Sequence, residues 1–349
     1  MFRNVLRSAT LLWGAANEIR RRRAGARPHT CGVHSSQPMP DGPGADERAA
    51  ARAERQCGAI GYRQLVEAGL SGPQIRRRRR SRRLLPTPAR AVYRVPGAPT
   101  GWMQDAWVAI LAGPTGSVIS HTSAAALHGL GDPPAIPHVT VPRTASGRIA
   151  GAVVHHGTLV SVDRCIVAGL ATTGVDRTIV DCAAVLGQEG LNQLSDAAIG
   201  RGRTRMESIG RAWDRAGHVE GGRLLTEALA PYAGGAPPGS VKAAHALRLF
   251  RRWGLPAPEC EYVVRDGQGR SVGRIDFVWR PWRFGLEYDG DEFHPPRRWE
   301  ADDRRQEAIE VLGLRLERAD RFDLRPSSTR LRELLIKILG EPPCPDGGL

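Results

Sequence analysis

Two stretches near the C-terminal end, Gly273-Arg-Ile-Asp-Phe-Val278 and Gly285-Leu-Glu-Tyr-Asp-Gly290, decide how this part of the chain folds. Both alternate apolar and polar residues, which predicts two adjacent β-strands. Asp276 interrupts an otherwise apolar strand and is expected on the face opposite to its neighbours. Glu287 and Asp289 are two residues apart, so they share a face of the second strand. Pairing of the two strands would therefore bring three carboxylates together.

Three converging carboxylates indicate a metal site. They repel one another and lose solvation unless a divalent cation lies between them. Oxygen ligands favour Mg²⁺ or Mn²⁺, so Asp276, Glu287 and Asp289 are the candidate metal ligands. Such an ion can activate water and offset charge on a scissile phosphate, which makes a hydrolytic site the leading interpretation. His294, just beyond the second strand, is the candidate general base or proton donor to the leaving oxygen.

The helix expected after these strands adds further polar residues. Asp302 and Asp303 are candidates for a carboxylate that supports the ligands, and Arg304 and Arg305 for a clamp on the phosphate. The alternative is a surface hairpin with solvated acids. That alternative explains Asp276 poorly, because this residue interrupts an apolar strand.

Around these strands, residues 240–340 predict one α/β domain with the element order αβββαβα. The last helix is expected to begin at Ser327, which can cap it. The expected elements are helix 240–253, strands 259–265, 272–279 and 283–288, helix 299–312, strand 314–318 and the helix from Ser327.

Residues 47–97 predict a winged helix-turn-helix. Helix 47–57 precedes a short helix within 60–70, in which Leu65 and Val66 are expected to point inward. After a tight turn, Ser71 is a possible N-cap for the next helix. That helix is basic and covers 74–83, and a hairpin-like wing over 84–95 completes the domain.

The basic helix carries the candidate DNA contacts. They are Arg76, Arg77, Arg78, Arg79 and Arg80, with Arg82 and Arg83 directly after them. Five consecutive arginines cover every face of a helix, so they are expected to contact phosphates and cannot all read bases. The alternative is a solvated charge run.

The net charge of +14 lies at one end of the chain. Residues 1–99 contain 20 Arg and 6 Asp or Glu, whereas residues 100–349 contain 30 Lys or Arg and 30 Asp or Glu. A basic block on an otherwise neutral protein indicates a polyanionic partner, most simply nucleic acid. Codon bias would explain the use of Arg over Lys but not this asymmetry.

Other features of composition favour a cytoplasmic protein. No apolar run approaches the roughly 18–20 residues of a membrane span, so no membrane partner is expected. The six cysteines are scattered without CxxC pairs, which fits a reducing compartment. Residues 1–46 are expected to be a disordered basic extension and linker, or the product of an over-called start codon.

A central α/β region is expected over 100–230, followed by a linker over 231–239. Alternation predicts strands over 137–142 and 151–156, and a helix is expected within 172–184. The histidines of this region have no compact metal-ligand spacing, so hydrogen-bonded structural roles are expected. They are His121, His128, His155 and His156.

The C-terminal motifs resemble a domain family related to very-short-patch-repair endonucleases, within the PD-(D/E)xK superfamily. The resemblance covers about 240–340 and is carried by Asp276, Glu287-Tyr-Asp-Gly290, His294, the 302–305 segment and Gly313-Leu-Arg-Leu-Glu-Arg318. It implies a restriction-endonuclease-like fold and metal-dependent DNA cleavage. Two features depart from the superfamily: Asp289 stands where Glu-x-Lys would place the lysine, and the opening helix segment 241–245 lacks a glutamate.

Residues 50–200 more weakly resemble AbiEi-type antitoxin proteins. The resemblance is carried by Gly69-Leu-Ser71, Ala91-Val-Tyr93, Ser120-His-Thr-Ser-Ala-Ala-Ala-Leu-His-Gly-Leu130 and Thr173-Gly-Val-Asp-Arg-Thr-Ile-Val-Asp181, among others. It implies an N-terminal winged helix that binds DNA, often an operator, and a possible cognate toxin.

Together these observations predict an α+β, or α/β, multidomain protein with DNA as its partner. The leading hypothesis is a metal-dependent DNA endonuclease guided by a winged helix. The alternative is a non-enzymatic regulator or antitoxin with a degenerate nuclease fold, which the missing lysine and glutamate favour. The oligomeric state stays open.

Overall fold

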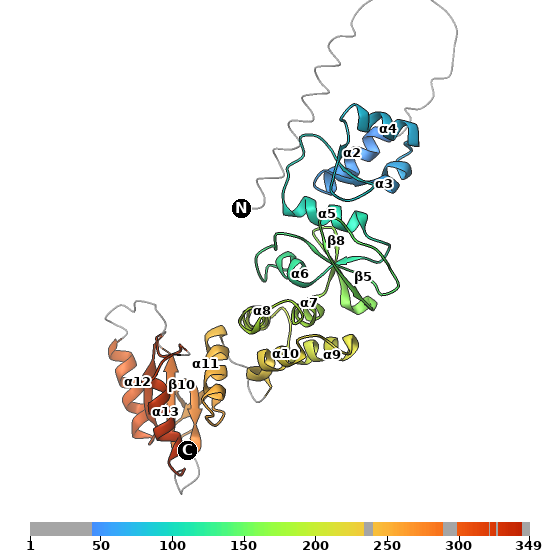
Figure 1. Ribbon diagram of the computed structural model, residues 1–349. Coiled ribbons are helices and arrows are strands. Elements are labelled where there is room, and N and C mark those ends of the chain that lie inside the picture. Colours follow the sequence, from blue (N-terminus) through green and yellow to red (C-terminus); the bar gives the residue numbers. More distant parts are fainter. Residues whose placement is uncertain (1–43, 234–239, 289–298, 321, 326, 344–349) are drawn as a thin grey trace, which may run out of the picture. The chain divides into compact units, whose positions relative to one another are not determined.

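The computed structural model describes residues 44–233, 240–288, 299–320, 322–325 and 327–343 (Figure 1). These residues form α-helices and three β-sheets, which confirms the expected mixed α/β class. The chain divides into two compact units. The first contains residues up to Ile119 with 135–157 and 168–171, and the second contains 120–134, 158–167 and the chain from 172 onward.

The first unit begins with a small helical bundle and its own sheet. In chain order the elements are α2 (Ala45–Arg55), β1 (Ala59–Gly61), α3 (Tyr62–Glu67), α4 (Gly72–Arg80), β2 (Leu85–Pro86) and β3 (Val92–Arg94). The sheet has the strand order β1-β3-β2, and both pairings are antiparallel. Ile60, Leu65 and Ile75 are almost completely buried in its core, so β1, α3 and α4 each contribute an apolar anchor.

Local sequence signals predicted the start of α4 better than its end. Ser71 caps the helix as expected, because its side chain accepts from Gln74 N while Gln74 Oε1 accepts from Ser71 N at 2.8 Å. The helix ends at Arg80 rather than residue 83, since Arg82 has a φ of 55° that no α-helix accommodates. Val66 was expected to point inward and this was wrong: it is 48% exposed, because α3 presents only Leu65 to the core.

The rest of the first unit adds helix α5 (Trp102–Ala112) and three strands. These strands are β4 (Val118–Ile119), β5 (His138–Pro142) and β6 (Val153–Gly157), in the order β6-β5-β4. The β4–β5 pairing is antiparallel and the β5–β6 pairing is parallel. The two longer strands lie close to the segments expected from alternation.

The second unit opens with helices around an apolar core. They are α6 (His121–Leu127), α7 (Val175–Cys182), α8 (Gln188–Gly200), α9 (Met206–Ala216) and α10 (Gly222–Leu229), with short 3₁₀ turns η1 (Ser161–Asp163) and η2 (Ala230–Tyr232). Strand β7 (Arg164–Val167) belongs to this unit, and β8 (Leu170–Thr173) crosses the boundary between the units. Ile179, Leu191 and Ile209 are completely buried in the core, which explains the apolar periodicity of these helices.

The C-terminal part of the second unit is built on a four-stranded sheet. Its elements are α11 (Val241–Arg252), β9 (Glu259–Arg265), β10 (Ser271–Trp279), the turn η3 (Arg280–Trp282), β11 (Phe284–Tyr288), α12 (Trp299–Val311), β12 (Arg315–Ala319) and α13 (Arg330–Gly340). The strand order is β12-β11-β10-β9. Strand β11 runs parallel to β12, and the other two pairings are antiparallel. The order of these elements is the order expected from the sequence.

Helices cover both faces of this sheet (Figure 1). Apolar residues of α11 and α13, among them Phe250 and Leu335, pack with Phe277 on one face. Ile309 of α12 packs with a second apolar group on the other. Ser327 was expected to cap the last helix and this was wrong: α13 begins at Arg330, after Thr329, whose side chain makes no cap hydrogen bond.

Candidate nucleic-acid interface and candidate metal centre

The basic helix α4 presents nearly all of its side chains to solvent. Ile75 is its one buried residue, at 1% exposure, and it packs into the core of the first unit. This single apolar contact fixes which side of the helix faces inward. The arginines therefore stay on the outer faces, where a polyanion can reach them.

Two arginines of α4 have partners within the first unit. Arg78 donates from Nε and Nη2 to the two carboxylate oxygens of Asp46, at 2.8 and 2.7 Å. The guanidinium of Arg79 lies 5.4 Å from the centroid of the Tyr93 ring, within the range of a cation–π contact. Arg78 is thereby tied to α2 and Arg79 to β3, so these two arginines are oriented by the fold.

The other predicted DNA contacts are free to engage a ligand. Arg76, Arg77 and Arg80 are exposed, and within the described part of the chain they make no ion pair. Arg82 and Arg83 are also exposed, in the turn after the helix. Unpaired exposed guanidinium groups repel one another, and a row of phosphates would relieve that repulsion.

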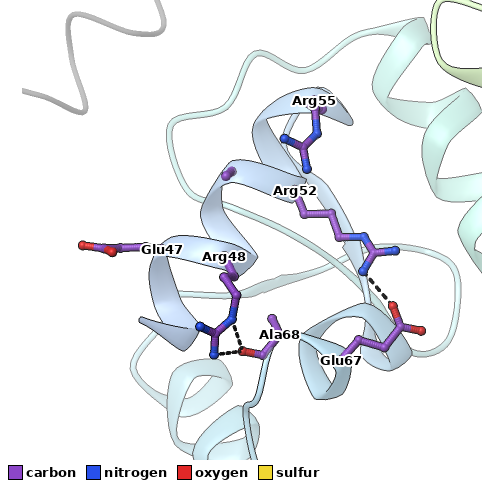
Figure 2. A pocket seen from close by; sticks show the side chains of 7 residues that line it. Glu47, Arg48, Arg52, Arg55, Glu67 and Ala68 are labelled. Atoms are coloured by element: carbon purple, nitrogen blue, oxygen red, sulfur yellow. Dashed lines mark hydrogen bonds and ion pairs between the residues drawn. The ribbon is translucent and has the colours of Figure 1, made fainter. Parts of the chain in front are cut away.

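A hollow of about 430 Å³ lies between α2 and α3 (Figure 2). Figure 2 shows two arginines of α2 reaching across it. Arg48 donates to the carbonyl oxygen of Ala68 at 3.2 and 3.0 Å, and Arg52 donates to Glu67 at 2.6 Å. These contacts join the two helices, and the Arg52–Glu67 contact is an ion pair, so we assign no ligand to this hollow.

In the second unit, Asp276 and Glu287 lie on adjacent strands, β10 and β11. The ladder pairs Phe277 with Leu286, one residue away from each. Asp276 Oδ2 accepts a hydrogen bond of 2.8 Å from the backbone N of Tyr288. The carboxylate of Asp276 therefore reaches the strand that carries Glu287, and the structure brings these two predicted ligands together.

Arg305, the predicted phosphate clamp, contacts one of the predicted ligands. From α12 its Nη2 donates to Glu287 Oε1, and its Nη1 lies 3.5 Å from Glu287 Oε2. The same Nη2 also donates to the carbonyl oxygen of Arg274 on β10. The side chains of Glu287 and Arg305 are 12% and 30% exposed, so this pair is partly shielded from water.

Several predicted site residues fall outside the described part of the structure. Asp289 and His294 lie outside the described residues. Asp302 and Asp303 belong to helix α12, but the structure does not describe their side chains. Arg304 is exposed on the same helix. The described part of the candidate centre therefore consists of Asp276, Glu287 and Arg305.

One further carboxylate was not singled out from the sequence. Glu261 lies on β9, next to the strand of Asp276, and its Oε2 lies 2.9 Å from Arg274 Nε. Burial, followed by the charges of Glu261 and Asp276, raises the pKa of Cys260 to about 11. The sequence did contain a signal for Glu261, because the predicted strand over 259–265 precedes the strand of Asp276 and would pair with it.

Asp276 and Glu287 offer carboxylate oxygens, which are the ligand type that a hard divalent cation prefers. Asp276 keeps one carboxylate oxygen without a hydrogen-bond partner among the described residues. Both oxygens of Glu287 face Arg305, so a metal at Glu287 would compete with that guanidinium.

Arg177 and Asp181 of the segment 173–181 belong to a buried ionic cluster in the second unit. Arg177 donates to Asp181 at 2.7 Å and lies 3.4 Å from Asp163. Arg215 also donates to Asp163, at 2.7 and 3.0 Å. Burial raises the pKa of Asp181 to about 6 in spite of its arginine partner. The cluster joins α7 to α9 and to the turn η1, which indicates a structural role.

The central histidines make hydrogen bonds. His128 Nε2 lies 2.8 Å from the carbonyl oxygen of Thr173. His138 Nδ1 lies 3.0 Å from His155 Nε2, and the two rings stack. Burial, with the neighbouring His138 and His156, lowers the pKa of His155 to about 4. These contacts agree with the hydrogen-bonded roles expected for His128 and His155, whereas His156 is exposed.

Comparison with known proteins indicates relatives but no family. No protein-family model matches the chain. Two uncharacterized proteins of Mycobacterium tuberculosis, from strains CDC 1551 / Oshkosh and ATCC 25618 / H37Rv, are each 28% identical to it over 195 residues. The match covers 55% of this chain and 69% of each relative. Among the described residues, no helix is both long enough and apolar enough to cross a membrane.

Proposed function

We propose that this protein binds DNA through the exposed arginines of α4 and hydrolyses DNA phosphodiester bonds with Mg²⁺ or Mn²⁺ at its C-terminal domain. The observation that carries the proposal is the pairing of Asp276 with Glu287 on adjacent strands, with Arg305 beside them. We place the activity in the cytoplasm.

The order of elements over 45–94 supports a winged helix for DNA binding. Helix α4 follows a tight turn after α3, and two antiparallel strands come after it, as in winged helix-turn-helix domains. Its unpaired arginines supply the phosphate contacts that dominate affinity for DNA. The resemblance to AbiEi-type antitoxins points in the same direction.

The order of elements over 241–340 and the two carboxylates support the hydrolytic activity. When bound, a divalent cation activates water and offsets charge on the phosphate. Asp276 and Glu287 would hold that cation, together with Asp289. Arg305 would bind the phosphate through its two parallel N–H groups, and His294 would move the proton.

A second function, a DNA-binding regulator or antitoxin without catalysis, is favoured by one observation. Both oxygens of Glu287 are engaged by Arg305, as expected for a stabilising ion pair. The lysine of the superfamily motif is also missing at Asp289. In this function the C-terminal domain would bind a partner, such as a cognate toxin.

The deciding experiment incubates purified protein with supercoiled plasmid and short duplexes in Mg²⁺, Mn²⁺ or EDTA. Asp276→Ala removes a candidate ligand, and Glu310→Gln is the matched control because it changes an exposed acid on α12. We expect metal-dependent nicking that is lost in Asp276→Ala and kept in Glu310→Gln.

Two other outcomes would change the conclusion. If no substrate is cut but tight, salt-sensitive binding persists, the regulator replaces the nuclease. If the protein neither cuts nor binds DNA, both functions are wrong.

A further inference from the structure

We propose that Arg305 is a latch that competes with the divalent cation for Glu287, so that the metal binds tightly only after a DNA phosphate has drawn Arg305 away. This inference rests on the proposed nuclease function and concerns regulation at the same site. Its consequence is that DNA and metal each strengthen the binding of the other, because coupling between two binding sites is reciprocal.

Arg305 contacts Glu287 directly. Arg305 presents two nitrogens to the two oxygens of Glu287, which is the fork geometry that guanidinium and carboxylate groups prefer. Each oxygen of a carboxylate held in this way keeps a second lone pair, but the positive guanidinium lies beside it and disfavours a second cation. The cation must therefore compete with the guanidinium for Glu287, and its apparent affinity falls.

Gly273 leaves the space that Arg305 occupies. A Cβ atom on Gly273 would lie 2.7 Å from Arg305 Nε and 3.2 Å from Ile309 Cδ1. Glycine weakens the interior of a strand unless another group must approach closely. Gly273 lies in β10, so its missing side chain is what allows Arg305 to cross the strand and reach Glu287.

Arg305 has a second acceptor besides Glu287. Its Nη2 also donates to the carbonyl oxygen of Arg274, the residue after Gly273. This anchor does not depend on Glu287, so Arg305 can rotate away from the carboxylate and remain close to the site. A phosphodiester offers the same bidentate geometry as a carboxylate, which makes DNA the natural competitor for the latch.

The test measures Mn²⁺ binding to the full-length protein by the electron paramagnetic resonance signal of free Mn²⁺, with and without a short DNA duplex. Arg305→Gln removes the latch charge, and Gly273→Ala displaces the guanidinium while keeping it. Arg315→Gln is the matched control, because Arg315 forms an exposed pair with Glu317 on β12 of the same sheet.

In the absence of DNA, we expect Arg305→Gln to bind Mn²⁺ about tenfold or more tightly than the wild type. The reason is that the cation no longer competes with a hydrogen-bonded contact between charged groups, and the size of the effect follows from the strength of such a contact. Gly273→Ala should shift in the same direction. DNA should tighten Mn²⁺ binding in the wild type and in Arg315→Gln, and should have little effect on Arg305→Gln.

The outcomes separate the latch from the site. If Glu287→Gln abolishes Mn²⁺ binding but Arg305→Gln leaves it unchanged or weaker, the latch is wrong and the metal site stands. If neither Glu287→Gln nor Asp276→Ala alters Mn²⁺ binding, the site itself is wrong and the latch falls with it. Circular dichroism of each variant shows whether the fold is retained, and Gly273→Ala supplies a second variant if Arg305→Gln unfolds.

Discussion

Neutralising the three unpaired arginines of α4 should flatten the salt dependence of DNA binding. In Arg76→Gln/Arg77→Gln/Arg80→Gln the intramolecular contacts of the fold are kept, because these side chains are exposed and make no ion pair within the described residues. Each lost phosphate contact reduces the slope of log K against log salt by about 0.9, so the slope should fall by about 2.7. Between 50 and 200 mM salt, the wild type should then lose about 40-fold more affinity than the variant.

The assay is fluorescence anisotropy of a labelled duplex titrated with protein at several salt concentrations. A matched triple variant removes the same net charge from exposed arginines of the second unit. These are Arg211, Arg223 and Arg251, each changed to Gln. If both triple variants reduce the slope equally, the effect reflects net charge and α4 is not the interface. An unchanged slope in the α4 variant would refute the phosphate contacts outright.

Three further predictions concern stability. Phe250→Ala should lower the free energy of unfolding by about 3–5 kcal/mol in urea denaturation, because Phe250 is 1% exposed and packs edge-on against two aromatic rings. Gly221→Ala should lower the melting temperature more than Gly202→Ala does. Both glycines have positive φ, but a Cβ at Gly221 would lie 2.0 Å from the carbonyl oxygen of the α7 C-cap, whereas a Cβ at Gly202 would meet open space. Equal melting temperatures would contradict this. His155 has a pKa of about 4, below its unfolded value of about 6.5, so the stability it contributes is present above pH 6.5 and is lost as the pH falls toward 4. His155→Gln should therefore weaken the pH dependence of unfolding between pH 4.5 and 7, whereas the exposed His218→Gln should preserve it.

Periodic sequence signals predicted the C-terminal elements well. The strand over 259–265 has the expected bounds, and β10 begins one residue before its expected start. The apolar residues of these strands are buried under helices on the two faces of the sheet. A pattern that arises from burial can be read from the sequence without knowledge of the partner.

Errors occurred where a local conformation, rather than burial, decides the outcome. The end of α4 depends on the left-handed backbone of Arg82, which nothing in a run of arginines indicates. Val66 has the residue type of a core position, yet α3 is so short that only Leu65 reaches the core. For α13, a serine with good capping chemistry lies three residues before the actual start of the helix.

The candidate site was predictable in its parts but not in its contacts. Alternation places Asp276 and Glu287 on neighbouring strands, and the ladder between β10 and β11 brings them together. Arg305 lies 18 residues after Glu287, on a helix, and its contact with that residue depends on the space above Gly273. Tertiary packing sets such a contact, so the sequence indicated Arg305 as a functional residue but not its contact with Glu287.

The pair of Arg305 and Glu287 has opposite meanings in the two proposed functions. In a regulator it would be a permanent ion pair, and its partly shielded position would make loss of either partner costly, because a charge would remain unpaired. In a nuclease the same contact is temporary, and its loss is compensated when a cation takes the place of the guanidinium. The difference lies in which other group can neutralise Glu287. A cation could neutralise Glu287 if a second hard ligand lay within reach. Asp276 could be that ligand, because one of its own carboxylate oxygens has no hydrogen-bond partner among the described residues. The hydrogen bond from the Tyr288 backbone gives Asp276 a structural use through one oxygen, and the nuclease proposal depends on its other oxygen.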